Sequence, residues 1–307
     1  DKMYAWGGSV SDWRGKGGYD FGSARARYDK TAAGMDSSRT YVRRSEPDMD
    51  LVNPKDKTIK SDSENPIVIA VDVTGSMAEW PGQIFDRLPL LYQTLSKYNE
   101  SAEFAFAAIG DATCDRYPLQ ISEFSKDPSE LEKMLKALGC EGGGGGHTTE
   151  SYELFGYYML NHVETPKAKS PFLLIYGDEQ FYSRIDPKQV NHYIGDSLQN
   201  PLESQKVWDD LLSRFNLYHL HKPYGSGLYT DVDKGIVDAW GKAIGRQRVI
   251  DLPSMERAVD VGMGLIAKHW GEYDDFSMSL DARHDDASLK KDVHRSLRFI
   301  SAAPSGK

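Results

Sequence analysis

The feature that most constrains the fold is an unbroken apolar run, Ile67 to Val71, within the segment NPIVIAVDVTGSMAEWP at 65–81. Such a run, rich in β-branched residues, is typical of a strand buried on both faces of a parallel sheet. The run leads into Asp-Val-Thr-Gly-Ser at 72–76, and we expect a helix from about Pro81, because proline is accepted in a first helical turn. The junction between a strand's carboxyl end and a helix is where α/β sheets place their ligand sites.

Strand and helix patterns alternate from there to Trp270. This alternation predicts an α/β fold, a doubly wound and mostly parallel central sheet with helices on both faces and one antiparallel edge strand. The expected strands are 67–72, 103–110, 119–124 (a short edge strand reached by a tight turn), 171–176, 215–220 and 248–252. The expected helices are 82–98, 128–138, one starting near Glu150 with Thr149 as its N-cap, 187–198, 203–213, 231–243 and 254–270.

We expect three parts along the chain. Residues 1–62 are rich in glycine and carry aromatic side chains at irregular spacing, which suits an extended N-terminal arm that docks through aromatic anchors. We favour docking on another subunit or partner, and docking on its own domain is the alternative. Residues 63–270 form the α/β domain, and 271–307 form a polar C-terminal tail with a short helix at about 286–299.

Oxygen-bearing side chains follow three of these elements. Asp72, Thr74 and Ser76 occupy alternate positions after the first strand, Thr148 (or Thr149) follows the glycine run 142–146, and Asp178 follows the strand 171–176. Carboxylates and hydroxyls converging at one edge of a sheet suit Mg²⁺, Mn²⁺ or Ca²⁺ rather than zinc. For three neighbouring residues we favour turn or solvated roles over ligation: Asp111, Asp115 and His147. Glu179 could tune the site or cap a helix, and Trp80 could contact a partner or pack under the first helix.

This set of residues resembles the von Willebrand factor type A (VWA) domain and its metal-ion-dependent adhesion site (MIDAS). The family motif Asp-x-Ser/Thr-x-Ser corresponds to 72–76, its loop threonine to Thr148, and its later aspartate to Asp178. The resemblance covers about 63–270 and implies a non-catalytic module that binds an acidic residue of a protein partner through the bound cation. It also implies, more weakly, an adaptor to an AAA+ ATPase of the MoxR type or to a larger assembly.

Two other functions stay open. One is a structural subunit that uses the arm, with the metal site secondary. The other is a Mg²⁺-dependent phosphotransferase or hydrolase with Asp72 as nucleophile; the absence of a glycine–lysine phosphate loop, and of a lysine after the third core strand, argues against it.

Composition narrows the setting. A formal net charge of −9 makes a nucleic-acid partner improbable, since such proteins normally carry a basic footprint. No apolar run approaches the roughly 20 residues of a membrane span. The two cysteines, Cys114 and Cys140, show no metal spacing and are expected to be reduced thiols in a cytoplasmic protein.

Overall fold

The computed structural model describes residues 46–141, 148–225, 230–283 and 287–301. The predictions for His147, for the glycine run 142–146 and for the aromatic residues before position 46 lie outside these ranges.

A six-stranded sheet forms the centre of the described chain, in the order β12-β11-β7-β2-β3-β4. Neighbouring strands run parallel except β3 and β4, which pair antiparallel at one edge. This confirms the predicted fold class. The strands are β2 Pro66–Asp72, β3 Glu103–Ile109, β4 Leu119–Ile121, β7 Phe172–Gly177, β11 Asn216–His221 and β12 Val249–Asp251.

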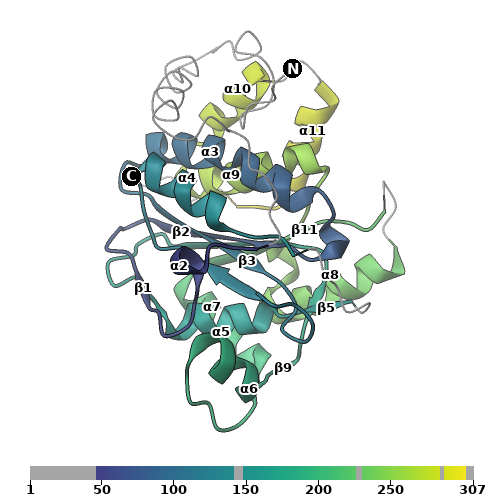
Figure 1. Cartoon of the computed structure of the whole chain (residues 1–307). Helices are drawn as coiled ribbons and strands as arrows, with labels where there is room; N and C mark the ends of the chain where they lie inside the picture. The colour runs from purple at the N-terminus through teal and green to yellow at the C-terminus, as the bar shows by residue number, and fades with distance from the viewer. Residues whose placement is uncertain (1–45, 142–147, 226–229, 284–286, 302–307) are drawn as a thin grey trace.

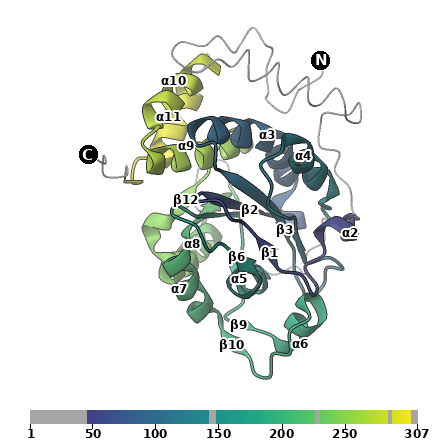
Figure 2. The same ribbon diagram turned by 90° about the vertical axis from the view of Figure 1, so that its left-hand side faces the viewer.

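Helices cover both faces of the sheet, as Figures 1 and 2 show. Because side chains alternate along a strand, Ile67, Ile69 and Val71 of β2 join the core cluster on one face, and Val68 and Ala70 join the other. The first face is covered by α3 Trp80–Tyr98, α4 Pro128–Ala137 and α9 Ala258–Trp270, and the second by α5 Tyr152–Asn161, α7 Ser204–Arg214 and α8 Asp231–Ile244.

Two local predictions are wrong. The edge strand β4 is reached through the loop 110–118 rather than a tight turn, and the Asp115 carboxylate holds that loop by accepting the Asp111 amide at 2.7 Å. Thr149 does not cap α5. It lies in the short strand β5 (Thr149–Glu150), which pairs with β8 (Gln180–Phe181), so Ser151 becomes the N-cap.

The helix predicted at 187–198 is shorter, because it ends in a π turn at Ile194 and Gly195 follows with a φ of 99°. An additional helix, α10, was not predicted and lies beside α9. The remaining elements are α2 Met49–Val52, β1 Ile59–Lys60, β6 Val163–Glu164, β9 Arg184–Ile185, α6 Pro187–Gln189, β10 Leu202–Glu203, α10 Tyr273–Arg283 and α11 Ala287–Ser296.

The described end of the predicted arm packs on its own chain. Strand β1 pairs in parallel with β6, and Val52 and Ile59 are fully buried. Within the described ranges, no helix combines the length and the apolar character needed to cross a membrane.

Candidate metal centre

Asp72 ends the central strand β2, at the carboxyl edge of the sheet, and is fully buried. Its Oδ1 accepts hydrogen bonds from the Thr74 amide at 2.9 Å and from the Thr74 hydroxyl at 2.6 Å. Its Oδ2 accepts a 2.5 Å hydrogen bond from the hydroxyl of Tyr152, the first residue of α5. A neighbour in sequence, Thr74, and the first residue of helix α5, Tyr152, therefore fix the two carboxylate oxygens.

A chain of oxygen atoms continues from Thr74 to the next strand. The Thr74 and Ser76 hydroxyl oxygens lie 3.3 Å apart, and Ser76 Oγ donates a 3.0 Å hydrogen bond to Asp178 Oδ1. Asp178 directly follows β7, the parallel neighbour of β2, and is also fully buried. The structure thus brings together Asp72, Thr74, Ser76 and Asp178, four of the five residues that the sequence predicts for this site.

The fifth residue, Thr148, makes its backbone contact with the segment that follows Asp178 rather than with the other four residues, as far as the described chain shows. Its carbonyl accepts a 3.1 Å hydrogen bond from the Gln180 amide, two residues after Asp178, and its side chain is exposed. In the described part of the chain its hydroxyl makes no hydrogen bond to the other four residues. The choice between Thr148 and Thr149 as the loop ligand stays a prediction.

Lys222 is a member of the site that the sequence prediction missed. It directly follows β11, and its Nζ lies 2.7 Å from Asp178 Oδ2, with the lysine side chain 10% exposed. The sequence did contain a signal for Lys222, because it is a polar residue just after a core strand and the carboxyl ends of parallel strands meet at one edge of a sheet. Lys222 follows β11, not β7, the third core strand, which no lysine directly follows in the sequence. The ammonium group at this edge of the sheet therefore comes from the strand next to β7.

Four carboxyl groups are buried at or beside the site, those of Asp72, Glu150, Asp178 and Glu179, and Lys222 is the cationic side chain that contacts them among the described residues. Burial first, and then the nearby Asp178 carboxylate, raises the pKa of Asp72 to about 7. Burial, with Asp72 and other carboxylates around it, raises the pKa of Glu150 to about 10. Burial and Asp178 raise the pKa of Glu179 to about 8, although Lys222 acts in the opposite direction. Among the described residues, the carboxyl oxygens Oε2 of Glu150 and Glu179 are buried and have no hydrogen-bond partner.

These residues fit a hard divalent cation. Oxygen ligands about 2.0–2.1 Å from Mg²⁺ in an octahedron lie roughly 2.9 Å from one another. The oxygen separations of 3.0 and 3.3 Å along Thr74, Ser76 and Asp178 are close to that spacing. Among the described residues no three His, Cys, Asp or Glu side chains form a metal-binding group by themselves. A cation here would therefore need the two hydroxyls as ligands.

Several residues near the site make structural contacts. Asp111 accepts the amide and the hydroxyl of Thr113, two residues on, which is the hydrogen bonding of an Asx turn. The Glu179 carboxylate accepts a hydrogen bond from the Tyr224 hydroxyl, and Trp80 packs partly buried against the core.

Comparison with known proteins gives only distant structural similarity. No family model and no curated protein sequence matches the chain. Among solved structures, the pilus adhesin SpaC of Lactobacillus rhamnosus GG is 12% identical, with a TM-score of 0.47 for its open conformation, where 74% of this chain matches 31% of the adhesin. Another SpaC structure, also 12% identical, has a TM-score of 0.43 over 70% of this chain and 32% of the adhesin. The VWA domain of SpRpn10 is 11% identical, with a TM-score of 0.40 over 64% of this chain and 94% of that domain. The chain thus spans about a third of the adhesin's length. The fold class given above rests on the strand order of this chain and not on these similarities.

Proposed function

We propose that the chain is a metal-dependent protein-interaction module. Thr74 and Ser76, with Thr148 from the neighbouring loop, would hold Mg²⁺ (or Mn²⁺ or Ca²⁺) through their hydroxyls, and Asp72 and Asp178 would hold it directly or through water. The observation that carries this proposal is the hydrogen-bonded convergence of Asp72, Thr74, Ser76 and Asp178 from two neighbouring strands.

The chemistry of these donors suits capture of a carboxylate. Hydroxyl ligands contribute no formal charge, so the bound cation keeps part of its positive charge for an incoming Asp or Glu side chain of a partner. The chain's own residues would fix the ligand positions. The Tyr152 hydroxyl donates a hydrogen bond to Asp72 Oδ2, and the Lys222 ammonium donates one to Asp178 Oδ2. Partner recognition would then depend on metal and on a single acidic anchor.

Calorimetric titration of the full chain with Mg²⁺ and Mn²⁺ tests the proposal. We expect binding to the wild type and at least a tenfold loss of affinity in Ser76→Ala, because one ligand oxygen is removed from a part-buried position. Ser213→Ala, which removes an exposed hydroxyl from α7, is the matched control and should bind metal as the wild type does. Equal affinities in wild type, Ser76→Ala and Asp178→Ala would overturn the proposal.

The geometry favours binding over catalysis. A nucleophilic Asp72 would need an accessible, ionised oxygen, but this residue is fully buried and both of its oxygens accept hydrogen bonds. An enzyme would release phosphate from p-nitrophenyl phosphate and lose that turnover in Asp72→Asn, whereas a binding module shows no turnover in either form.

We propose further that the partner is a subunit of a larger assembly. The specific candidate is an AAA+ ATPase of the MoxR type, and the family resemblance alone supports that identity. Pull-down of the candidate ATPase should require Mg²⁺ and fail in Ser76→Ala. Capture that survives EDTA and the substitution would instead favour the structural-subunit alternative.

A further inference from the structure

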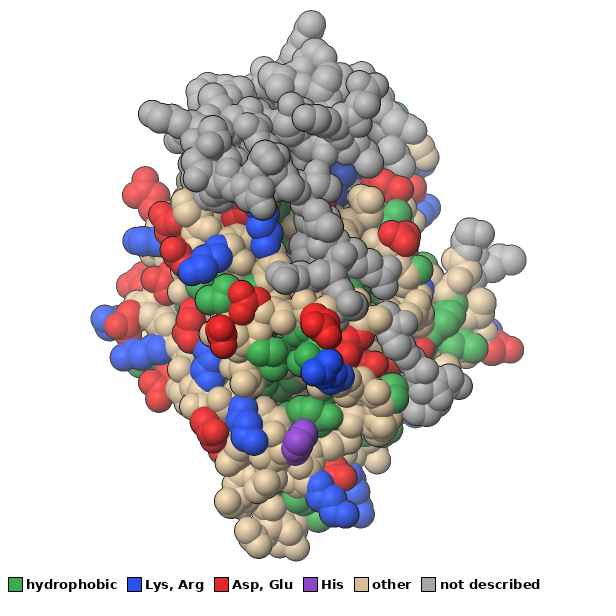
Figure 3. All heavy atoms as spheres, viewed as in Figure 1, with side chains coloured by type: hydrophobic (Ala, Val, Ile, Leu, Met, Phe, Trp, Pro, Cys, Tyr) green, Lys and Arg blue, Asp and Glu red, His purple; other side chains and the backbone are tan. Residues whose placement is uncertain are grey.

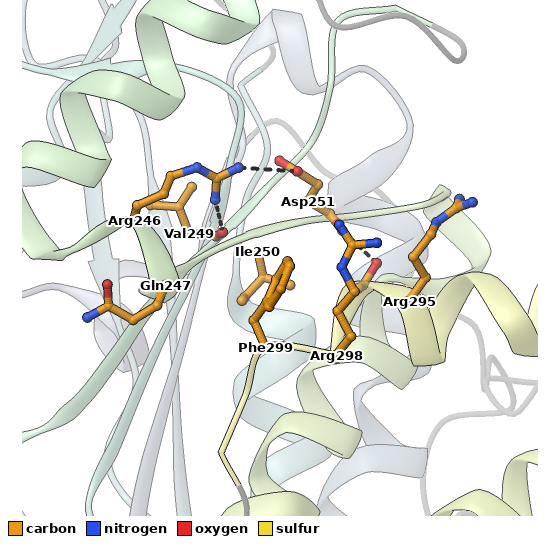
Figure 4. A pocket seen from close by; sticks show the side chains of 9 residues that line it. Arg246, Gln247, Val249, Ile250, Asp251, Arg295, Arg298 and Phe299 are labelled. Carbon is orange, nitrogen blue, oxygen red and sulfur yellow. Dashed lines mark hydrogen bonds and ion pairs between the residues drawn. The ribbon is translucent and has the colours of Figure 1, made fainter.

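A cavity lined by both charged and apolar side chains lies at the edge of the sheet opposite β4. It has a volume of about 690 Å³ and is formed between strand β12, the preceding turn at 246–248, and the end of helix α11. Figure 4 shows its lining side chains, with the guanidinium groups of Arg246 and Arg298 on two sides and the Phe299 ring beside Ile250 between them. The cavity therefore combines cationic walls with an apolar surface.

The strand edge in this cavity is closed to a further strand. Arg246 Nη1 donates a 2.7 Å hydrogen bond to the Val249 carbonyl, and Ser296 Oγ donates a 2.8 Å hydrogen bond to the Asp251 carbonyl. Side chains thus occupy outward-facing carbonyls of β12, which is one way in which proteins protect an edge strand. A ligand of this cavity would be recognised by the side chains rather than by strand addition.

The arginines differ in how far they are neutralised. Arg295 pairs with Asp292 at 2.8 Å, and Arg246 lies 3.6 Å from Asp251 in a pair whose side chains are about half exposed. Within the described residues, the Arg298 guanidinium has the Phe299 ring as its contact, 4.5 Å from the ring centroid. Phe299 is itself 71% exposed. An arginine and an aromatic ring presented together to solvent are the side chains that most often dominate protein interfaces.

We propose that this cavity binds a short acidic segment of a protein partner, with a carboxylate between Arg246 and Arg298 and an apolar side chain against Phe299 and Ile250. Charge complementarity supports this occupant: the chain carries a net charge of −9, yet three arginines and a single carboxylate, that of Asp251, line this cavity. A phosphate ion alone would leave Phe299 without a role. This contact is independent of the metal centre and uses arginine side chains, not a metal ion, to bind the carboxylate.

Selection from a bead-displayed library of terminally blocked hexapeptides, with the full chain in EDTA, tests the proposal. We expect sequences that combine Asp or Glu with a large apolar residue. The most enriched peptide, measured by fluorescence anisotropy, should bind at least tenfold more weakly to Arg298→Gln and to Phe299→Ala. Both residues are exposed, so these substitutions leave the fold intact. Affinity should also fall as salt is raised, because an exposed ion pair is screened.

Arg184→Gln is the matched control, because Arg184 is an exposed arginine paired with Glu203 away from the cavity, and it should bind the peptide as the wild type does. Enrichment without acidic residues, or peptide binding unchanged in Arg298→Gln, would overturn the proposal. So would inorganic phosphate binding that depends on Arg298 without any peptide selection. Self-association in sedimentation that is lost in Phe299→Ala, without peptide binding, would assign the surface to a second copy of the chain.

Discussion

At the scale of single residues, Lys222 and the two aspartates form one electrostatic unit. Asp72 and Asp178 are fully buried, and in the described residues the Lys222 ammonium is the cationic group in contact with Asp178, at 2.7 Å. Removing one partner of a buried ion pair is costly because the other charge stays desolvated. A divalent cation at Thr74, Ser76 and Asp178 would supply positive charge to the same carboxylates.

Lys222→Met should therefore lower the stability of the chain in EDTA, by on the order of 3 kcal/mol in the free energy of unfolding. It should also make the stabilisation by Mg²⁺ larger than in the wild type, because the cation then relieves an uncompensated carboxylate. Thermal denaturation with and without 10 mM MgCl₂ measures both effects.

Lys234→Met provides the control, because Lys234 pairs with Asp231 on the surface of α8 and such pairs contribute little. A Mg²⁺-induced shift of equal size in Lys222→Met, Lys234→Met and the wild type would show that the cation does not act on Asp178.

The sequence predicted part of this site for a physical reason. Asp72 and Asp178 follow buried strands, and parallel neighbours end at the same edge, so their proximity followed from the pattern. Tyr152 and Lys222 could not be assigned in the same way. The Tyr152 contact depends on how α5 packs against the end of β2, and the Lys222 contact depends on β11 lying next to β7.

At the scale of elements, the end of β7 and the start of α5 are in close contact. Gly177 is the last residue of β7, and a Cβ at this position would overlap the Tyr152 hydroxyl and lie 2.8 Å from its Cζ. The glycine therefore leaves the space in which Tyr152 donates to Asp72. Substitution here would change the metal centre through the packing of two elements.

Gly177→Ala should lower the free energy of unfolding by about 1–3 kcal/mol, the usual cost of overpacking, and should weaken Mg²⁺ binding as Tyr152 moves from Asp72. Chemical denaturation and calorimetry provide the two measurements. Gly235→Ala is the matched control: it lies inside α8, its nearest contact would be Gln180 Nε2 at 3.7 Å, and alanine is favoured there by up to about 1 kcal/mol. Unchanged metal affinity in Gly177→Ala would contradict the role given to Tyr152.

The elements that were predicted correctly carry an apolar pattern over many residues, and those that were missed carry a short or weak one. The strands β2, β3 and β7 carry apolar runs typical of a buried strand, β11 carries an alternating pattern, and the positions of all four are confirmed. Helix α10 buries Phe276 and Leu280 within an otherwise polar stretch, so its period was too weak to identify. The strands β5 and β8 pair only two residues each, and their pairing depends on the fold around them.

At the scale of the whole molecule, residues 46–62 connect separate parts of the surface. Lys57 Nζ donates to the carbonyls of Leu51 and Ile121, and the Tyr158 hydroxyl donates to the Lys57 carbonyl. On the face shown in Figure 3, acidic and basic side chains are interspersed. The segment is attached by these hydrogen bonds, by an ion pair of Lys57 with Glu123 at 3.2 Å and by the buried side chains of Val52 and Ile59. We expect the segment to unfold together with the α/β domain.

Ile59→Ala tests that expectation, because Ile59 lies in β1 and is fully buried against the same core cluster as α5 and α7. The substitution should cost about 2–4 kcal/mol in the free energy of unfolding, the usual loss for a buried isoleucine truncated to alanine. Urea denaturation followed by circular dichroism should show one transition with a lower midpoint and an unchanged slope. Lys60→Ala, the exposed neighbour in β1, should leave the midpoint nearly unchanged. A loss below about 0.5 kcal/mol in Ile59→Ala, or a second transition at low urea, would show that β1 separates from β6 before the domain unfolds.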